Sequence, residues 1–477
     1  MNITAPIRRF ARMTPDAPAI IDPQGGTLTY AMLERALDVL AHHAAQLGLR
    51  PGDIVGLDAG GNTPGIPLLL MLALARIGVA TARPDLPGGV LKLTFQYGPS
   101  APPGAVAFDA TWLTVDPAAP PIPAAALHDD PEALFRLFAS SGTTGAPKHV
   151  PFSHALMTRR VFSRWLVQGG GRQTNMMAFN LGAVPGCVGV LATLWQGGTV
   201  VLFQPDNVLA AIEQYGVEGL RIAPTTLHML LEQRPPGRGP LPCLREITVS
   251  GSRLPDRLRQ MAEERLCPNV VCGLGSTEVQ PIAIGPVPPG EARPDAIGFV
   301  AADATVQAVD AQDRPLPPGH QGILRVRSPT MADRYFNDPD ATAAHFRDGW
   351  FYPGDVGIVW PDGLLSLTGR VSDVINLGGD KYHPVTVESV LQRFPGIRDA
   401  AVFAVENEAG VPEMCAAVVS NGPLDENAFH AYAKQHFPGI SFAVVVELAE
   451  LPRNAAGKVQ RERLVALVAA LDGEAER

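Results

Sequence analysis

Residues 138–148 read Phe-Ala-Ser-Ser-Gly-Thr-Thr-Gly-Ala-Pro-Lys and follow the run 133–137, which is apolar except for Arg136 and short enough to form a strand. Two glycines allow the backbone to turn closely around an anion, because glycine adopts conformations that other residues avoid. Successive N–H groups in such a turn form a concave anion site. The loop also supplies four hydroxyl groups and one ammonium group, in the series Ser140, Ser141, Gly142, Thr143, Thr144, Gly145 and Lys148. This composition predicts a clamp for a polyphosphate.

The loop differs from the phosphate loop of the Walker A type. That motif places Gly-Lys directly before Ser or Thr at the start of a helix. Here Ala146-Pro147 separate Gly145 from Lys148, and His149 follows. A polar surface turn is the alternative, since clusters of Gly, Ser and Thr commonly mark loops. The loop alone therefore indicates a kind of site and no family.

The bulk composition is that of a large globular protein. A length of 477 residues suggests roughly two to four domains, and 46% hydrophobic residues suffice for large cores. The net charge of −9 argues against broad binding of nucleic acid. The N-terminus has no secretory signal, and the most apolar stretch, 67–74, is far shorter than the ~20 residues of a membrane span, so it reads as a buried helix. We therefore expect a cytoplasmic protein without a membrane partner.

The five cysteines contain no Cys-x-x-Cys pair and are odd in number, which disfavours both a metal site and a disulfide framework. We expect buried free thiols instead.

After the clamp, short apolar runs at 199–203, 219–223 and 246–250 alternate with stretches of helical pattern. This rhythm predicts an α/β fold with mostly parallel sheets. Ligands of such sheets bind at the carboxyl ends of the strands, where 250–252 and 273–278 are rich in Gly, Ser and Thr.

Beyond residue 296 turn signals multiply and the pattern becomes β-rich. The segment that begins near residue 370 has strands and helices of its own and is large enough for a small α+β domain. We therefore expect a large N-terminal domain over residues 1–369 and a small C-terminal domain over residues 370–477.

Four further sites carry chemistry suited to a nucleotide. Thr277-Glu278 offers a hydroxyl and a carboxylate, and magnesium held with phosphates commonly uses one or two carboxylates. Asp355 lies on a tight turn where it could accept hydrogen bonds from ribose hydroxyls, and Arg370 could join it. Lys458 lies in a Gly-containing loop near the C-terminus. Each site alone is a weak signal, because aspartates in turns are commonly caps and loop lysines are commonly solvated.

In this order, the clamp, the Gly-Asp turn, Gly-Arg-x-x-Asp and the terminal Pro-Arg-x-x-x-Gly-Lys resemble the adenylate-forming superfamily of acyl-CoA synthetases, adenylation domains and luciferases. The resemblance covers nearly the whole chain and is strongest to an acyl- or aryl-CoA ligase. It implies that ATP and Mg²⁺ convert a carboxylic acid to an acyl-adenylate with release of pyrophosphate, and that a thiol then takes the acyl group. It also implies a mobile C-terminal domain that rotates between the two steps.

The resemblance implies the following residue roles. The clamp from Ser140 to Lys148 would hold phosphates. ATP would also contact Ser250, Gly251 and Ser252 beside the adenine, and Gly275 and Ser276. Thr277 and Glu278 would contact the α-phosphate and magnesium, Asp355 and Arg370 the ribose, and Lys458 would be the catalytic lysine. The hinge would be Ser372, where the family usually has Asp or Lys.

The acyl pocket is expected at Phe179, Asn180, Ala183 and Gly186, in a stretch that resembles the pocket segment of the family. It lacks an Asp beside Phe179 that could pair with an ammonium group, which favours a non-amino acid. Small and apolar residues suit an aliphatic or an aryl acid. The thiol tunnel is expected at Gly378, Gly379 and Lys381, and either CoA or the phosphopantetheine of a separate acyl-carrier protein would fit.

Three alternatives remain open at this level. The acceptor could be an amine or the reaction could stop at the adenylate, the acid could be an amino acid, or the chain could be a non-catalytic nucleotide-binding relative. The presence of Lys148, Glu278, Asp355, Arg370 and Lys458 argues against the last. The acid, the acceptor and the choice between a monomer and a homodimer stay open.

Overall fold

The structure is a computed structural model that describes residues 1–58, 65–114, 122–140, 147–168, 171–252, 254–286, 293, 296–377, 380–407, 411–453 and 459–475. The chain forms two compact units. The first comprises 1–286, 301–304 and 327–351, and the second comprises 287–300, 305–326 and 352–477. The predicted boundary between residues 369 and 370 lies inside the second unit, so a division at that position stays a prediction.

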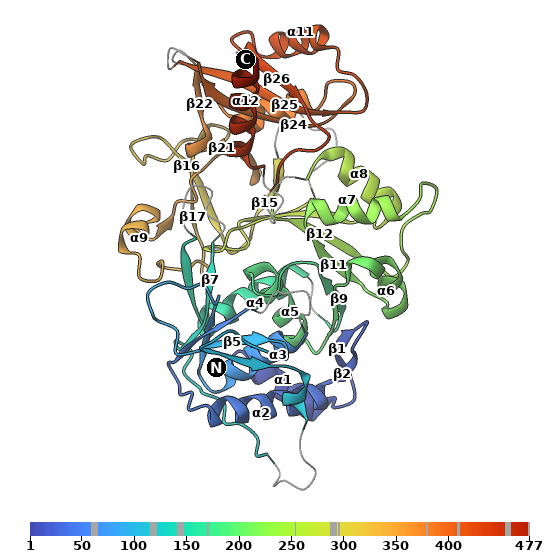
Figure 1. Ribbon diagram of the computed structural model, residues 1–477, viewed down its shortest axis with the longest axis vertical. Coiled ribbons are helices and arrows are strands. Elements are labelled where there is room, and N and C mark those ends of the chain that lie inside the picture. Colours follow the sequence, from blue (N-terminus) through green and yellow to red (C-terminus); the bar gives the residue numbers. More distant parts are fainter. Residues whose placement is uncertain are drawn as a thin grey trace. The chain divides into compact units, whose positions relative to one another are not determined.

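One sheet of the first unit is built from alternating strands and helices (Figure 1). The chain runs through β9 (Thr174–Met177), α5 (Val184–Trp195), β10 (Thr199–Leu202), α6 (Val208–Tyr215), β11 (Gly219–Ile222), α7 (Pro224–Gln233), β12 (Glu246–Ser250), α8 (Asp256–Arg265) and β13 (Val270–Leu274). These strands pair in parallel in the order β13-β12-β11-β9-β10, and β1 (Pro18–Asp22) continues the parallel order. The outer strands β2 (Gly26–Thr29) and β14 (Ala283–Gly285) are antiparallel. The predicted α/β rhythm is confirmed.

A second sheet of the first unit has six strands in the order β6-β5-β3-β4-β7-β8. They are β3 (Ile54–Leu57), β4 (Ala80–Ala82), β5 (Thr94–Tyr97), β6 (Ala105–Phe108), β7 (Leu134–Ala139) and β8 (His149–Ser153), parallel except for the hairpin of β7 and β8. The other elements of the unit are α1 (Ala5–Met13), α2 (Tyr30–Gln46), α3 (Gly65–Arg76), η1 (Ala110–Leu113), α4 (His154–Gln168), η2 (Pro205–Asn207), α9 (Pro339–His345), β18 (Phe346–Arg347) and β19 (Trp350–Phe351). Every residue of α3 from Pro67 to Arg76 is buried, as predicted for the apolar stretch.

A buried ion network fastens the first three helices together. Arg76 at the end of α3 is fully buried and pairs with Glu34 and Asp38, which lie one turn apart on α2. Arg8 of α1 also contacts Glu34, with 2.6 Å between its Nε and Oε1. Each buried charge has a partner, as the high cost of burying an unpaired ion requires.

His154 joins the start of α4 to the N-terminal segment. Its ring is fully buried, and Nδ1 accepts a hydrogen bond of 3.1 Å from the backbone N–H of Ile3. Burial lowers the pKa of His154 to about 4, because the cation would be desolvated there. Protonation of Nδ1 would also remove the acceptor. The neutral ring is therefore the form that the fold requires.

We expect this histidine to make stability depend on pH. Between the ordinary histidine pKa near 6.5 and about 4, the unfolded chain binds a proton that the folded ring does not. The neutral ring contributes fully to the free energy of unfolding above pH 6.5. As the pH falls from 6.5 to about 4, this contribution of about 3 kcal/mol at most is lost. The test is urea denaturation at falling pH, for the wild type and for His154→Asn, which keeps an acceptor near Nδ1. The midpoint urea concentration should decline less with falling pH in the variant than in the wild type. An equal decline in both proteins would contradict the assignment.

The second unit begins with the predicted β-rich part. Strands β15 (Ala296–Val300), β17 (Gln321–Arg327), β20 (Asp355–Val359) and β21 (Leu364–Arg370) are antiparallel, with β20 between β17 and β21, and β16 (Thr305–Val309) pairs with β17.

The C-terminal part of the second unit is a small α+β fold. Its strands β24 (Ile397–Glu406), β25 (Pro412–Ser420) and β26 (Phe442–Glu447) form one sheet, and β22 (Ile375–Leu377) pairs with β23 (Asp380–Tyr382). Alternate residues of β24 and β25 belong to two different cores, since side chains of a strand point to opposite faces. Helices α10 (Pro384–Leu391) and α11 (Glu426–His436) contribute to one core, and α12 (Arg461–Ala475) contributes to the other. The predicted fold class is confirmed.

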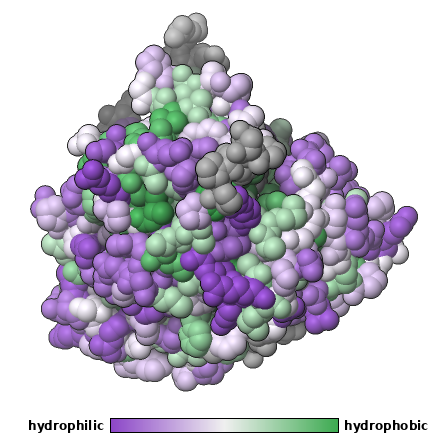
Figure 2. Space-filling model, turned by 90° about the horizontal axis from the view of Figure 1, so that it is seen from below, coloured by the Kyte–Doolittle hydropathy of each residue, from purple (hydrophilic) through white to green (hydrophobic). Residues whose placement is uncertain are grey.

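The surface seen in Figure 2 is mainly hydrophilic, and hydrophobic side chains lie in small groups between polar ones. Among the described helices, none is both long and apolar enough to cross a bilayer. None of the five cysteines forms a disulfide. Cys187, Cys267 and Cys415 are buried, as the sequence predicted, whereas Cys243 and Cys272 are only partly buried.

Candidate active site

The predicted phosphate clamp closes the hairpin of β7 and β8. Ala139 lies opposite His149, and the backbone N–H of Ser140 donates to the carbonyl oxygen of Lys148 over 2.7 Å. The two ends of the loop are thus held together by strand pairing. The loop joins two strands and does not open a helix, which agrees with its departure from the Walker A pattern. Five predicted residues between these ends lie outside the described residues: Ser141, Gly142, Thr143, Thr144 and Gly145.

Lys148 lies in a cluster of side chains that are distant in sequence. Its Nζ is 2.9 Å from Nε2 of His345 and 5.2 Å from the ring centroid of Tyr335. The hydroxyl of Tyr335 donates to Oε1 of Glu278 over 2.8 Å. Tyr335 therefore connects the lysine of the clamp to the predicted magnesium ligand.

Glu278 and Thr277 lie on a tight turn after β13. The N–H of Ser276 donates to the carbonyl oxygen of Val279, and Oγ of Ser276 accepts from the N–H of Val279. This turn leaves Gly275 exposed and Thr277 partly exposed, and it buries the carboxylate of Glu278. Burial and the negative charge of Glu278 both raise the pKa of Tyr335, so the phenol keeps its proton and donates.

The donor set around Glu278 fits a magnesium ion that is bound mainly through phosphates. Among the described residues, no group of three or more His, Cys, Asp and Glu side chains could hold a metal by itself. Glu278 forms no ion pair with a described cation. Magnesium usually keeps phosphate and water ligands and takes one or two carboxylates from the protein.

Ser250, Gly251 and Ser252 follow the carboxyl end of β12. Ser250 lies opposite Gly273 of β13, so the predicted adenine segment and the turn of Glu278 begin at the same edge of the sheet. Gly251 has a φ of +100°, which suits glycine.

The predicted ribose residues face each other in the second unit. Asp355 opens β20 and lies opposite Arg370 at the end of β21, with 3.0 Å between Oδ1 and Nε. The carboxylate is buried and the guanidinium is partly exposed. The predicted hinge residue Ser372 is exposed in η3 (Val371–Asp373) and donates to Asp373 over 2.7 Å.

The remaining predicted residues of the second unit are described only in part. Lys381 contributes its backbone to β23, but Gly378 and Gly379 lie outside the described residues. Lys458 also lies outside them, in a segment whose flanks are paired through a bridge between Arg453 and Val459.

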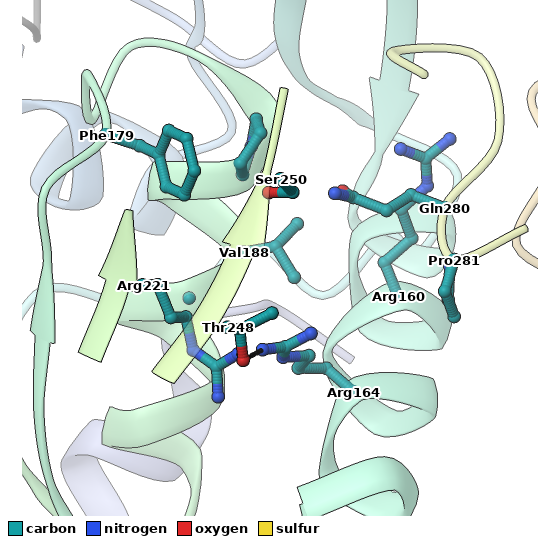
Figure 3. A pocket seen from close by; sticks show the side chains of 11 residues that line it. Arg160, Arg164, Phe179, Val188, Arg221, Thr248, Ser250, Gln280 and Pro281 are labelled. Atoms are coloured by element: carbon teal, nitrogen blue, oxygen red, sulfur yellow. Dashed lines mark hydrogen bonds between the residues drawn. The ribbon is translucent and has the colours of Figure 1, made fainter. Parts of the chain in front are cut away.

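The first unit contains a cavity whose lining includes Gln280, two residues after Glu278 (Figure 3). About 40 Å³ of it is open to the centres of water-sized molecules, and the empty space between the lining residues is about 470 Å³ when open solvent is counted. Helices α4 and α5, strands β11 and β12, and the segments after β9 and β13 supply the lining: Arg160, Arg164, Phe179, Pro185, Val188, Gly189, Arg221, Thr248, Ser250, Gln280 and Pro281.

Of the four residues predicted for the acyl pocket, Phe179 lines this cavity. Asn180 and Ala183 are exposed, and Oδ1 of Asn180 accepts from the N–H of Gly182 over 2.7 Å. Gly186 is buried where a Cβ would collide with the carbonyl oxygen of Asn180. These three residues shape the turn into α5, and Pro185, Val188 and Gly189 line the cavity beside them.

The site residues that were not predicted from the sequence are Tyr335, His345 and the three arginines of the cavity. The arginines had a signal: Arg221 interrupts an apolar strand of four residues, and Arg160 and Arg164 are spaced for one face of a helix. Tyr335 and His345 stand in no motif, so only the fold reveals them.

Known proteins share the sequence features of this site. Residues 105–336 match the family model for AMP-binding enzymes, and residues 386–458 match the model for the C-terminal domain of AMP-binding enzymes. The chain is 30% identical to the feruloyl-CoA synthase of an Amycolatopsis species, over 95% of this chain and 96% of that protein. It is 29% identical to the 4-chlorobenzoate–CoA ligase of an Arthrobacter species, over 95% and 93% of the two chains.

Solved structures agree with the sequence comparisons. The amide bond synthetase McbA from Marinactinospora thermotolerans superposes with a TM-score of 0.83 at 27% identity, over 98% of this chain and 99% of that chain. The chain belongs to the AMP-binding enzyme family, and the predicted resemblance to adenylate-forming enzymes is confirmed.

Proposed function

We propose that this protein activates a small carboxylic acid with ATP and transfers the acyl group to CoA. In the first step the carboxylate oxygen attacks the α-phosphorus and pyrophosphate leaves, which gives an acyl-adenylate. In the second step the thiol sulfur attacks the acyl carbon, AMP leaves, and the thiol proton is lost. One observation carries the proposal: the turn that holds Glu278 leads within two residues into the lining of a cavity that Phe179 and Val188 make partly apolar.

The described residues can divide the work as follows. Lys148 and the ends of the clamp would bind the phosphates that leave as pyrophosphate, while Thr277 and Glu278 lie nearer the acid cavity. Tyr335 holds the Glu278 carboxylate in place. Magnesium, when bound by Glu278 and the phosphates, would offset negative charge, which is a large term in such reactions.

Asp355 and Arg370 of the second unit suit the two hydroxyls of ribose, because one accepts and the other donates hydrogen bonds. Lys458 would offset charge on the α-phosphate, and rotation at Ser372 would then admit the thiol past Gly378, Gly379 and Lys381. We assign the reaction to the cytoplasm, where free CoA and ATP are available.

CoA is the favoured acceptor because the relatives with 29–30% identity are named as CoA ligases. An amine acceptor is the second candidate, since a structural neighbour at 27% identity is named an amide bond synthetase. A separate acyl-carrier protein remains a third possible source of the thiol.

Exchange of labelled pyrophosphate into ATP tests the first step. We expect exchange that depends on both magnesium and an acid, in a panel of aliphatic and aryl acids, and formation of an acyl-CoA when CoA is added. Absence of exchange with every acid would favour a non-catalytic nucleotide-binding protein. Amide formation with amines, without thioester formation, would favour the second candidate.

A further inference from the structure

Three guanidinium groups line the acid cavity. Arg160 and Arg164 project from one face of α4, and Arg221 projects from β11 (Figure 3). Arg160 and Arg221 are 1% and 4% exposed, and Arg164 is partly buried. Arginine is rarely buried unless it is paired with an anion. Three cationic side chains around one cavity are therefore unusual.

The protein itself compensates these cations only in part. Nη2 of Arg164 and Nη1 of Arg221 donate to Oγ1 of Thr248, over 3.3 and 3.0 Å, and Thr248 donates to Glu246 over 2.8 Å. Nε of Arg221 is buried without a hydrogen-bond partner. Among the described residues, no carboxylate forms an ion pair with any of the three arginines. An uncompensated buried cation is costly, so a bound anion would offset much of this cost.

Arg160 belongs to a different part of the cavity from the other two. Its Nε donates to the carbonyl oxygen of Thr330 over 2.8 Å, and its guanidinium lies 4.5 Å from the ring centroid of Phe152. In Figure 3 it extends past Gln280, away from Thr248. Burial lowers the pKa of Arg160 to about 9, against the opposing effect of Glu278, and burial lowers the pKa of Arg164 to about 10. Both side chains thus remain cationic at neutral pH.

Arg164 and Arg221 both contact Thr248, which precedes Ser250 by two residues on β12 and therefore lies roughly 7 Å further along the same face of the strand. Ser250 and Gln280 line the other end of the cavity, and Gln280 follows Glu278 by two residues. Val188 forms an apolar wall between the two ends, and Phe179 forms one on the Ser250 side (Figure 3).

We propose, building on the function above, that the acid substrate carries a second anionic group, and that Arg164 and Arg221 bind it at the Thr248 end of the cavity. A second carboxylate is the simplest such group, because guanidinium groups match its geometry. The reacting carboxylate would lie beside Ser250 and Gln280, with a spacer of a few carbon atoms along the apolar walls. The predicted aliphatic or aryl body fits these walls, while the cationic end adds a dicarboxylate class that the sequence did not indicate.

Matched acid pairs provide the test. In pyrophosphate exchange with the full-length protein, we expect kcat/KM for succinate, glutarate, adipate or terephthalate to exceed that of the matched monoacid by about 100-fold for the best pair. The monoacids are butyrate, pentanoate, hexanoate and 4-methylbenzoate. Arg221→Met and Arg164→Met should each lower the value for the diacid by about 100-fold, mainly through KM, and leave the monoacid within a few-fold. Arg245→Met is the matched control, since Arg245 precedes β12, is exposed and pairs with Glu218.

Binding measured by calorimetry in the presence of ATP separates this proposal from the proposed function. Diacid binding that Arg221→Met or Arg164→Met abolishes and Arg245→Met retains would support the arginine pair, even if no acid supports exchange. A wild-type preference for monoacids would overturn the proposal. Equal losses for diacid and monoacid in both arginine variants, with ATP binding retained as evidence of folding, would also overturn it.

Discussion

Replacing Glu278 by glutamine is expected to lower acid-dependent pyrophosphate exchange by about 100-fold, which is the usual scale for one lost electrostatic contact of a transition state. Glutamine keeps the shape of the side chain and an oxygen that accepts from Tyr335, so the substitution removes mainly the negative charge. Among the described residues of this turn, Glu278 supplies the carboxylate that could bind magnesium. Exchange should be measured over a range of magnesium concentrations, and the half-saturating concentration should rise in the variant.

Tyr335→Phe is the matched control for Glu278→Gln. It removes the hydroxyl that donates to Glu278 but keeps the ring beside Lys148. We expect a smaller loss of about 10-fold, because residues that orient a metal ligand matter less than the ligand itself. Wild-type exchange by Glu278→Gln at every magnesium concentration would show that this carboxylate holds no essential ion. Thermal denaturation of both variants would establish that each is folded.

The elements that the sequence predicted well are those with local patterns. The runs at 199–203, 219–223 and 246–250 became β10, β11 and β12 with nearly the expected bounds. Strands of a parallel sheet are buried on both faces, so they appear as short apolar runs that are easy to recognise. The apolar stretch 67–74 became the buried part of α3 for the same reason. Glycine-rich turns at strand ends were equally visible, because turn chemistry is local.

Contacts between distant residues left no such pattern. Tyr335 reaches Glu278 across 57 positions and His345 reaches Lys148 across 197, so neither could be paired by spacing. The predicted acyl-pocket segment differs from the cavity lining for another reason. Its position was predicted from likeness, but the turn at Asn180 directs that side chain to its own backbone, and the lining begins at Pro185. Arg221 was visible as a charge within an apolar strand, yet only the fold places it beside Arg164 at Thr248 in the cavity.

Replacing Lys458 by alanine is expected to separate the two half-reactions. We expect pyrophosphate exchange to fall by about 1,000-fold, because a cation that acts on the α-phosphate in the transition state contributes to the rate and not only to binding. Thioester formation from a supplied acyl-adenylate and CoA should stay within a few-fold of the wild type, since no charge develops on a departing pyrophosphate in that step. Stopped assays of both half-reactions with the same acid would measure the ratio.

Lys434→Ala is the matched control for Lys458→Ala, because Lys434 is an exposed lysine on α11 of the same unit. It should leave both half-reactions unchanged. Equal loss of the two half-reactions in Lys458→Ala would contradict a mechanism in which the C-terminal domain presents this lysine in one step and withdraws it in the next. Selective loss of the first half-reaction would instead require two arrangements of the chain. Lys458 would act beside the acyl carbon during adenylation, and the thiol must reach the same carbon in the second step. Ser372, exposed and bonded only to Asp373 among the described residues, would then be a residue at which the backbone could turn between them.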